Sequence, residues 1–200
     1  TPGHEFVGDV VAADDERWAG RRVVADINAG CGACEDCLTR DGHHCPTRTV
    51  LGILGRQGAF AERVSVPERC LVEVPAGLDD DRAVFAEPLA AALHVLDVLA
   101  ERRGSRAIVL GDGKLALLIA LALRAEGVDT TVVGHHEHKL AIARRAGASC
   151  HLEADLPASA RGADVVVEAT GSERGLARAI ELVRPRGAVI LKTTVAAPFQ

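Results

Sequence analysis

The sequence predicts an α/β protein with two parts, a β-rich first domain followed by a doubly wound parallel sheet. In the first part of the 200 residues, short strand-like runs are separated by Gly, Pro and Asp clusters, which is typical of a β domain. From about residue 105, short apolar runs alternate with helical patterns, and this alternation indicates a parallel sheet with right-handed crossovers. As a third observation, four cysteines between residues 31 and 45 predict a compact metal lobe within the β domain.

The β domain is expected at residues 1–76, followed by a connecting helical segment at residues 77–104. Acidic residues from Asp79 precede an apolar-periodic pattern, which predicts that a helix begins there. We expect this helix to break near Pro88, because proline removes a helical hydrogen bond. In the β domain, the strand-like runs are 8–13, 21–27, 60–66 and 70–74.

The second domain is expected at residues 105–200. Apolar runs predict its buried strands, and the first two helices should end at Gly127 and Gly147, since glycine commonly follows the last helical turn. No internal repeat or low-complexity linker interrupts the pattern. The expected strands are 107–110, 130–133, 164–168 and 188–191, and the expected helices are 114–126, 136–145 and 172–183.

The composition indicates a globular cytoplasmic protein. Hydrophobic residues make up 48% of the chain and charged residues 26%, which suits a substantial core. A net charge of −5 and an aromatic content of 2% argue against nucleic acid as a partner. The longest apolar run, 115–123, is far shorter than the roughly 20 residues that cross a bilayer. Because no basic and apolar leader is visible either, we expect no membrane partner.

Four cysteines, Cys31, Cys34, Cys37 and Cys45, have the spacing of a closed zinc site. Zinc is satisfied by four thiolates at about 2.3 Å, and such a shell leaves no position for water or substrate. The predicted site is therefore structural. A disulfide cluster or four unrelated buried thiols are the alternatives, but clustered thiols in a cytosolic chain favour metal.

A glycine-rich turn, Gly-Asp-Gly-Lys-Leu-Ala at residues 111–116, connects a predicted strand to a predicted helix. The first glycine allows the tight turn, the second lets the backbone approach a pyrophosphate, and the third position needs a small residue for packing. The helix N-terminus would hold the phosphates. This context indicates a dinucleotide-binding Rossmann domain, with a bare turn as the alternative. The candidate cofactor-binding residues are Gly111, Asp112, Gly113, Lys114, Leu115 and Ala116.

The end of the second strand slightly favours NADP over NAD. An Asp or Glu at this place binds the adenosine ribose of NAD in such domains, whereas this chain has Gly134, His135 and His136. The strand end lacks an acid that would repel the 2′-phosphate of NADP, and His135, His136 and Lys139 could approach that phosphate. The alternative is that the histidines are solvated surface groups.

Several motifs occur in a characteristic order. They are Gly-His-Glu-Phe-Val-Gly at residues 3–8, the four-cysteine lobe, Gly-Ala-Phe-Ala-Glu at 58–62, Glu-Pro-Leu at 87–89 and the glycine turn at 111–116. This combination resembles the zinc-dependent medium-chain dehydrogenase/reductases, closest to the branch with polyol, sugar and threonine dehydrogenases, over essentially the whole chain. The resemblance implies a partial GroES-like catalytic domain followed by a partial Rossmann domain.

The resemblance also implies a zinc-dependent NAD(P) alcohol or polyol dehydrogenase with a second, catalytic zinc. His4 would be one zinc ligand, and Glu5 and Glu87 are the carboxylate candidates. Related alcohol dehydrogenases have a cysteine at the position of Glu87, whereas the polyol-like branch has a glutamate that binds metal directly or through water. The alternatives are that Glu5 only pairs with a nearby base and that Glu87 only begins a helix.

Under the same resemblance, the nicotinamide would be held by the glycine turn and by a loop of Ala169, Thr170 and Gly171. A small alcohol or polyol would be the substrate. Family members carry a first catalytic cysteine and a proton-relay Ser or Thr before the Gly-His-Glu motif, and they continue after the position of residue 200 with a dimer-forming edge. We therefore expect an internal piece of a longer protein, inactive alone and homo-oligomeric at full length.

Two other functions stay open. A zinc-free quinone-type reductase of the same superfamily is one, although the four-cysteine lobe and His4 argue against it. A non-catalytic, zinc-stabilised nucleotide-binding scaffold is the other. Metal content separates these possibilities, because only the dehydrogenase needs a catalytic zinc in addition to the lobe.

Overall fold

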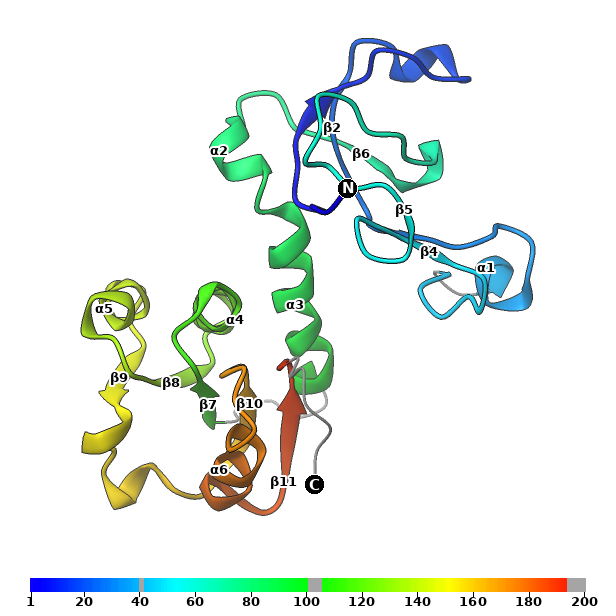
Figure 1. Cartoon of the computed structure of the whole chain (residues 1–200). Helices are drawn as coiled ribbons and strands as arrows, with labels where there is room; N and C mark the ends of the chain where they lie inside the picture. The colour runs from blue at the N-terminus through cyan, green and yellow to red at the C-terminus, as the bar shows by residue number, and fades with distance from the viewer. Residues whose placement is uncertain (40–41, 101–105, 194–200) are drawn as a thin grey trace. The chain divides into compact units, whose positions relative to one another are not determined.

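Backbone contacts divide the chain into two units, Thr1–Pro88 and Leu89–Gln200. The computed structural model describes residues 1–39, 42–100 and 106–193, and Figure 1 shows their helices and strands. The division falls inside the segment expected to connect the domains. The domain limits at residues 76 and 105 stay a prediction, because the compactness of the backbone does not test them.

A first small sheet in unit Thr1–Pro88 has β2 (Arg22–Ala25) at its centre. It pairs in antiparallel fashion with β1 (Gly8–Asp9) and with β6 (Leu71–Glu73). The sequence predicts strands at all three places, but β1 is shorter than the expected run 8–13. Val23 and Ala25 are buried and alternate with half-buried residues, as expected for a strand with one face on a core.

A second small sheet in the same unit carries the cysteine lobe. Its central strand is β4 (Thr49–Leu51), which runs antiparallel to β3 (Asn28–Ala29) and parallel to β5 (Gly55–Arg56). The lobe lies between β3 and β4 and contains the short helix α1 (Glu35–Thr39). The sequence does not predict these strands, because each is only two or three residues long and lacks a clear alternating pattern.

The strand expected at residues 60–66 does not form. The N–H groups of Ala59 and Phe60 donate to the carbonyls of Gly3 and Pro2, at 2.8 and 3.0 Å. The backbone at the start of this run therefore pairs with the beginning of the chain and not with a strand ladder. Phe60 is 75% exposed, so its apolar side chain does not mark a face on the core.

Two helices, α2 (Asp80–Ala83) and α3 (Ala86–Ala100), follow the small sheets. Asp79 caps α2, since its side chain accepts a hydrogen bond from Arg82 N at 2.9 Å. The break between the helices lies before Ala86, earlier than the expected break near Pro88. Pro88 instead lies in the first turn of α3, where a missing N–H is tolerated.

In the described residues of the second unit, five parallel strands form one sheet with β7 (Arg106–Leu110) at its centre. β8 (Asp129–Gly134) and then β9 (Ser149–Leu152) follow on one side, and β10 (Ala163–Glu168) and then β11 (Val183–Leu191) on the other. The winding direction thus reverses at β7. This confirms the predicted doubly wound sheet, in which ligands bind near the carboxyl ends of the strands at the reversal.

Helices cover both faces of this sheet (Figure 1). Ala107 and Val109 of β7 pack in the core cluster that contains residues of α4 (Lys114–Ala125) and α5 (Glu137–Arg145). The alternate residues of β7, Ile108 and Leu110, pack in the cluster that contains residues of α6 (Gly175–Leu182). A strand whose residues are buried on both faces reads as a continuous apolar run, which is why β7 is predictable.

Three elements of the second unit differ from prediction. β9 is not predicted, because Ser-Cys-His-Leu has no apolar run. α6 begins at Gly175 and not at residue 172, since Ser172 holds a turn in which Gly175 N donates to its carbonyl at 3.0 Å. β11 begins at Val183, before Pro185, although the apolar pattern starts only at residue 188.

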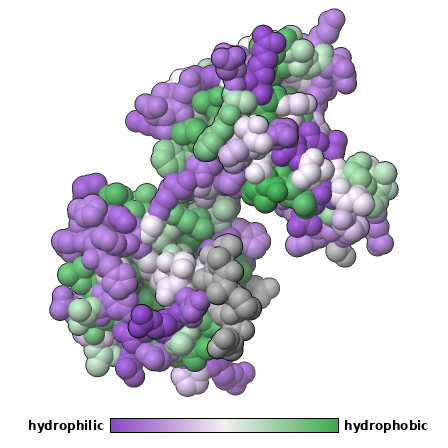
Figure 2. Space-filling model, in the orientation of Figure 1, coloured by the Kyte–Doolittle hydropathy of each residue, from purple (hydrophilic) through white to green (hydrophobic). Residues whose placement is uncertain are grey.

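Polar residues cover most of the surface seen in Figure 2, and apolar residues reach it in separate patches. Single exposed apolar side chains are ordinary for folded proteins. The part of the chain that the structure describes has no helix of the length and apolarity needed to cross a membrane.

Short 3-10 helices lie at Glu16–Trp18, Glu68–Cys70, Glu153–Asp155 and Ala158–Ala160.

We predict that Leu140→Ala destabilises the protein much more than Ile142→Ala, although both residues lie on α5. Leu140 is 0% exposed in the core cluster, whereas Ile142 is 38% exposed. Loss of the buried side chain should lower the free energy of unfolding by about 2–5 kcal/mol. Urea denaturation measures both variants, and equal losses would contradict the described packing of α5.

Candidate metal and nucleotide sites

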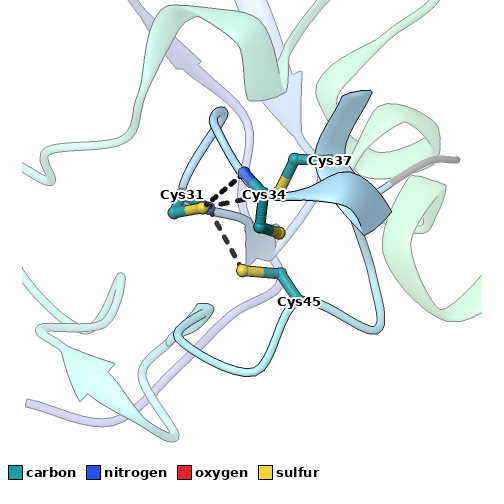
Figure 3. A group of neighbouring side chains, drawn as sticks. All are labelled: Cys31, Cys34, Cys37 and Cys45. Carbon is teal, nitrogen blue, oxygen red and sulfur yellow. Dashed lines mark hydrogen bonds between the residues drawn. The ribbon is translucent and has the colours of Figure 1, made fainter. Parts of the chain in front are cut away.

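Four thiols converge in the lobe between β3 and β4 (Figure 3). The Sγ atoms of Cys31, Cys34, Cys37 and Cys45 lie within 4.8 Å of one another, and those of Cys31 and Cys37 are 3.9 Å apart. Four sulfurs bonded to one zinc at about 2.3 Å must lie about 3.8 Å apart. All six cysteines of the chain are free thiols, so the structure does not contain the alternative disulfide cluster. The four donors therefore fit a closed zinc site.

Backbone amides donate hydrogen bonds to the sulfurs of Cys31 and Cys45. The Cys31 thiol accepts hydrogen bonds from the N–H groups of Ala33 and Cys34 at 3.4 and 3.3 Å. The Cys45 thiol accepts one from Cys31 N at 3.4 Å, and Figure 3 shows the bonds between the cysteines. Such donors stabilise the thiolate form of a cysteine and orient it toward a metal. Cys45 is fully buried, whereas Cys31 is exposed.

The thiols differ in how readily they ionise. A hydrogen bond from the amide two residues later lowers the pKa of Cys31, and a hydrogen bond with the Thr47 hydroxyl is the main cause that lowers the pKa of Cys45 to about 6. The N–H of Cys37 acts to lower the pKa of Cys34, but the hydrogen bond with the Cys37 thiol and burial together raise it to about 12. A bound divalent cation would let all four ionise, with release of protons.

His4, Glu5 and Glu87 also come together, in the first unit. One donor atom from each lies within 4.8 Å of the others, and His4 Nε2 is 4.0 Å from Glu87 Oε2. The side chains of His4 and Glu87 are 34% and 22% exposed, so they are reachable from solvent. Zinc in catalytic sites uses imidazole and carboxylate donors and keeps a position open. The residues predicted from two separate motifs thus form one donor set.

Glycines hold the segment that carries His4. Gly3 has a φ of +97°, and the N–H groups of Gly58 and Ala59 donate to carbonyls at the beginning of the chain. A Cβ at Gly58 or at Gly52 would clash with the backbone of Gly3. The Gly-Ala-Phe-Ala-Glu motif therefore holds the backbone next to His4 in place through these hydrogen bonds. Gly52 is not recognisable from the sequence, because a lone glycine reads as an ordinary turn.

The glycine turn lies between β7 and α4, as predicted. Gly111 has a φ of +118°, and a Cβ there would lie 2.5 Å from the carbonyl oxygen of Ala169. Around Gly113 no atom lies within 4 Å of the Cβ position, which leaves room for a ligand. Ala116 is fully buried in the core cluster, which confirms the packing expected of a small residue there. Of the other turn residues, Lys114 is exposed and Leu115 half-buried.

Asp112 extends from this turn to the end of β8. Its Oδ2 accepts hydrogen bonds from the N–H groups of His135 and His136 at 2.8 and 2.7 Å, and His136 Nδ1 lies 3.0 Å away. Burial acts to raise the pKa of Asp112, but these three hydrogen bonds together hold it below its usual value. A carboxylate therefore lies beside this strand end, although it comes from the glycine turn and not from the strand, and the preference for NADP stays a prediction.

The three basic residues that are predicted to approach a 2′-phosphate have different surroundings in the structure. His135 Nε2 lies 3.2 Å from Glu153 Oε2, and His136 faces Asp112. Lys139 is half-buried near the start of α5. Both imidazoles therefore have acidic partners.

A buried carboxylate that the sequence pattern does not single out holds the predicted loop 169–171. Glu168 is 1% exposed, and its Oε1 accepts hydrogen bonds from Thr170 N, Thr170 Oγ1 and Thr193 Oγ1 at 2.8, 2.6 and 3.0 Å. Thr193 Oγ1 in turn accepts one from Gly171 N at 2.7 Å. An acid at the end of a run of valines is the signal that could have found it.

We predict that Gly111→Ala destabilises the protein, whereas Gly113→Ala does not. At Gly111 the substitution meets both a positive φ and the Ala169 carbonyl, but at Gly113 it meets open space. A strained backbone conformation alone costs about 1–3 kcal/mol. Thermal and urea unfolding compare the two variants, and a Gly111→Ala variant as stable as wild type would contradict the close approach of the turn to the loop after β10.

Comparison with known proteins adds to these observations. The model of the alcohol dehydrogenase GroES-like domain matches residues 1–76, and that of the glucose dehydrogenase C-terminus matches residues 81–198. The L-threonine 3-dehydrogenase of Bacillus subtilis (strain 168) is 29% identical over 92% of this chain and 56% of its own length. The sorbitol dehydrogenase of Halalkalibacterium halodurans is 30% identical over 94% of this chain and 59% of its own length.

A solved structure shows the same fold. It is described as a zinc-binding dehydrogenase from Sinorhizobium meliloti 1021 bound to NADP, and it has a TM-score of 0.87 and 28% identity over 100% of this chain and 63% of its own. The chain thus spans between 56% and 63% of the length of these relatives. The matches cover both units, and they agree with the family that the motifs resemble. The chain belongs to the zinc-type medium-chain dehydrogenases.

Proposed function

We propose that the whole protein is a zinc- and nicotinamide-dependent dehydrogenase that transfers a hydride between a secondary alcohol or sugar alcohol and NAD(P). The observation that carries this proposal is the convergence of His4, Glu5 and Glu87 within 4.8 Å. The threonine and sorbitol dehydrogenases similar to this chain support the substrate class.

The two groups of metal-binding side chains support two metal sites of different kinds. His4 with Glu5 and Glu87 would hold a catalytic zinc, because partly exposed nitrogen and oxygen donors leave a position for substrate. When bound there, zinc supplies Lewis-acid polarisation of the substrate hydroxyl and lowers its pKa. Cys31, Cys34, Cys37 and Cys45 would hold a structural zinc, since four thiolates leave no open position.

The residues of the second unit would bind and orient the cofactor. The turn at 111–116 leads directly into the N-terminus of α4, and a helix N-terminus attracts a pyrophosphate. Glu168 holds Thr170 through two hydrogen bonds, and this fixes the loop 169–171 at the carboxyl edge of the sheet. A fixed loop can orient the nicotinamide ring without losing entropy during the reaction.

We predict that His4→Gln in the full-length protein removes one metal ion and most of the activity. Zinc content should fall from about two to about one per subunit, and kcat/KM for a polyol by about 100-fold or more. Elemental analysis and NAD(P)H absorbance measure the two effects. His94→Gln is the matched control, because His94 is an exposed histidine of α3 outside both metal groups.

The metal content also separates the other functions. Full-length protein with about one zinc and no nicotinamide reduction with any alcohol would support the scaffold. Protein without zinc that reduces quinones would support the quinone-type reductase. Either result would overturn the dehydrogenase proposal.

We predict that Cys45→Ser loses the lobe zinc and destabilises the first unit. Cys45 is fully buried, and a closed zinc site contributes directly to folding. Zinc content should fall by about one per subunit, and thermal unfolding should begin at a lower temperature. Cys150→Ser is the control, since the Cys150 thiol donates to the Leu140 carbonyl in the second unit. Equal zinc content in wild type and Cys45→Ser would contradict the structural site.

A further inference from the structure

The side chain of Asp112, after β7, fills the space that a side chain at Gly134, the end of β8, would need. A Cβ at Gly134 would lie 2.6 Å from the Asp112 Cβ and 2.7 Å from its Oδ2. Gly134 is the last residue of β8, where dinucleotide-binding domains place the acid that binds the ribose hydroxyls. A side chain at residue 134 is therefore incompatible with Asp112 in its observed position. The carboxylate at this strand end comes from the glycine turn instead.

One oxygen of the Asp112 carboxylate accepts hydrogen bonds from the protein, and the other does not. Oδ2 takes all three hydrogen bonds, from His135 N, His136 N and His136 Nδ1. In the described residues, Oδ1 accepts no hydrogen bond, although the side chain is only 10% exposed. Oδ1 is not among the fully enclosed polar atoms without a partner, so it is the part of Asp112 that a ligand can reach. A nearly buried acceptor without a partner gains by accepting a ligand hydroxyl.

The surroundings keep Asp112 charged and in place. The three bonds to Oδ2 hold its pKa below the usual range, so Asp112 is a carboxylate at neutral pH. His135 is paired with Glu153 at 3.2 Å near the end of β8, and Glu153 is in turn paired with Arg178 at 3.4 Å. A 2′-phosphate there would meet the Asp112 carboxylate and would have to compete with acids for both imidazoles.

We infer that Asp112 is the residue that selects NAD over NADP, because its Oδ1 accepts a hydrogen bond from the 2′-hydroxyl of the adenosine ribose and its charge repels a 2′-phosphate. This inference rests on the proposed nucleotide site. It assigns to the glycine turn a selection that such domains otherwise make from the end of the second strand.

Direct binding tests the inference without any need for catalysis or metal. Titration calorimetry with NAD⁺ and with NADP⁺ should give tighter binding of NAD⁺ by wild-type full-length protein, by about tenfold or more. Asp112→Asn keeps an oxygen that can accept from the N–H groups of His135 and His136 but loses the charge. We expect this variant to bind NAD⁺ more weakly and NADP⁺ more tightly, so that the preference disappears or reverses.

A matched control separates this role from a general charge effect. Glu137→Gln removes a carboxylate from the first turn of α5, where it pairs with Arg144 at 2.7 Å, and should leave the preference unchanged. Equal affinity of wild type for the two nucleotides, or a preference that Asp112→Asn does not alter, would overturn the inference and leave the proposed function standing. Protein that binds neither nucleotide would overturn both.

Discussion

The backbone amides at the carboxyl edge of the parallel sheet impose the constraint on which the nucleotide site depends. After β8 ends, the N–H groups of the next two residues donate to a carboxylate, whereas after β10 Ala169 N still donates to the Leu110 carbonyl of β7 and Thr170 N is the first that does not. Asp112 accepts from the amides that follow β8, and Glu168 accepts from Thr170 after β10. Two nearly buried carboxylates thus shape both loops.

Both candidate sites also depend on close approaches that only glycine allows. Gly111 lets the turn reach the Ala169 carbonyl, and Gly52 and Gly58 let two segments meet the backbone of Gly3. These contacts join residues that are distant in sequence. The glycines thus position the functional groups of neighbouring residues, such as the imidazole of His4. A substituted Cβ would move the loop and the functional group together, because the segments are too short to absorb the shift.

The sequence predicts the parts of the molecule whose pattern is local. β7 and β10 are apolar runs, α4 has a helical pattern before a glycine, and the spacing of the four cysteines brings them together in one lobe. Long-range hydrogen bonds decide the rest. The run 60–66 pairs with the beginning of the chain instead of forming a strand. Asp112 is predicted from the sequence as part of the glycine turn, but its hydrogen bonds to the amides after β8 depend on a contact between strands that the sequence does not show.

Two metal groups in one unit can do different work because their donors differ in charge and exposure. Four thiolates neutralise a divalent cation beyond its charge and enclose it, so the lobe around Cys45 gains stability and loses any reactive position. His4, Glu5 and Glu87 provide fewer and harder donors on partly exposed side chains. A cation held there would keep an open coordination position, and a substrate oxygen would be polarised at that position. Separation of the two donor types would therefore let one ion hold the fold while the other stays available for chemistry.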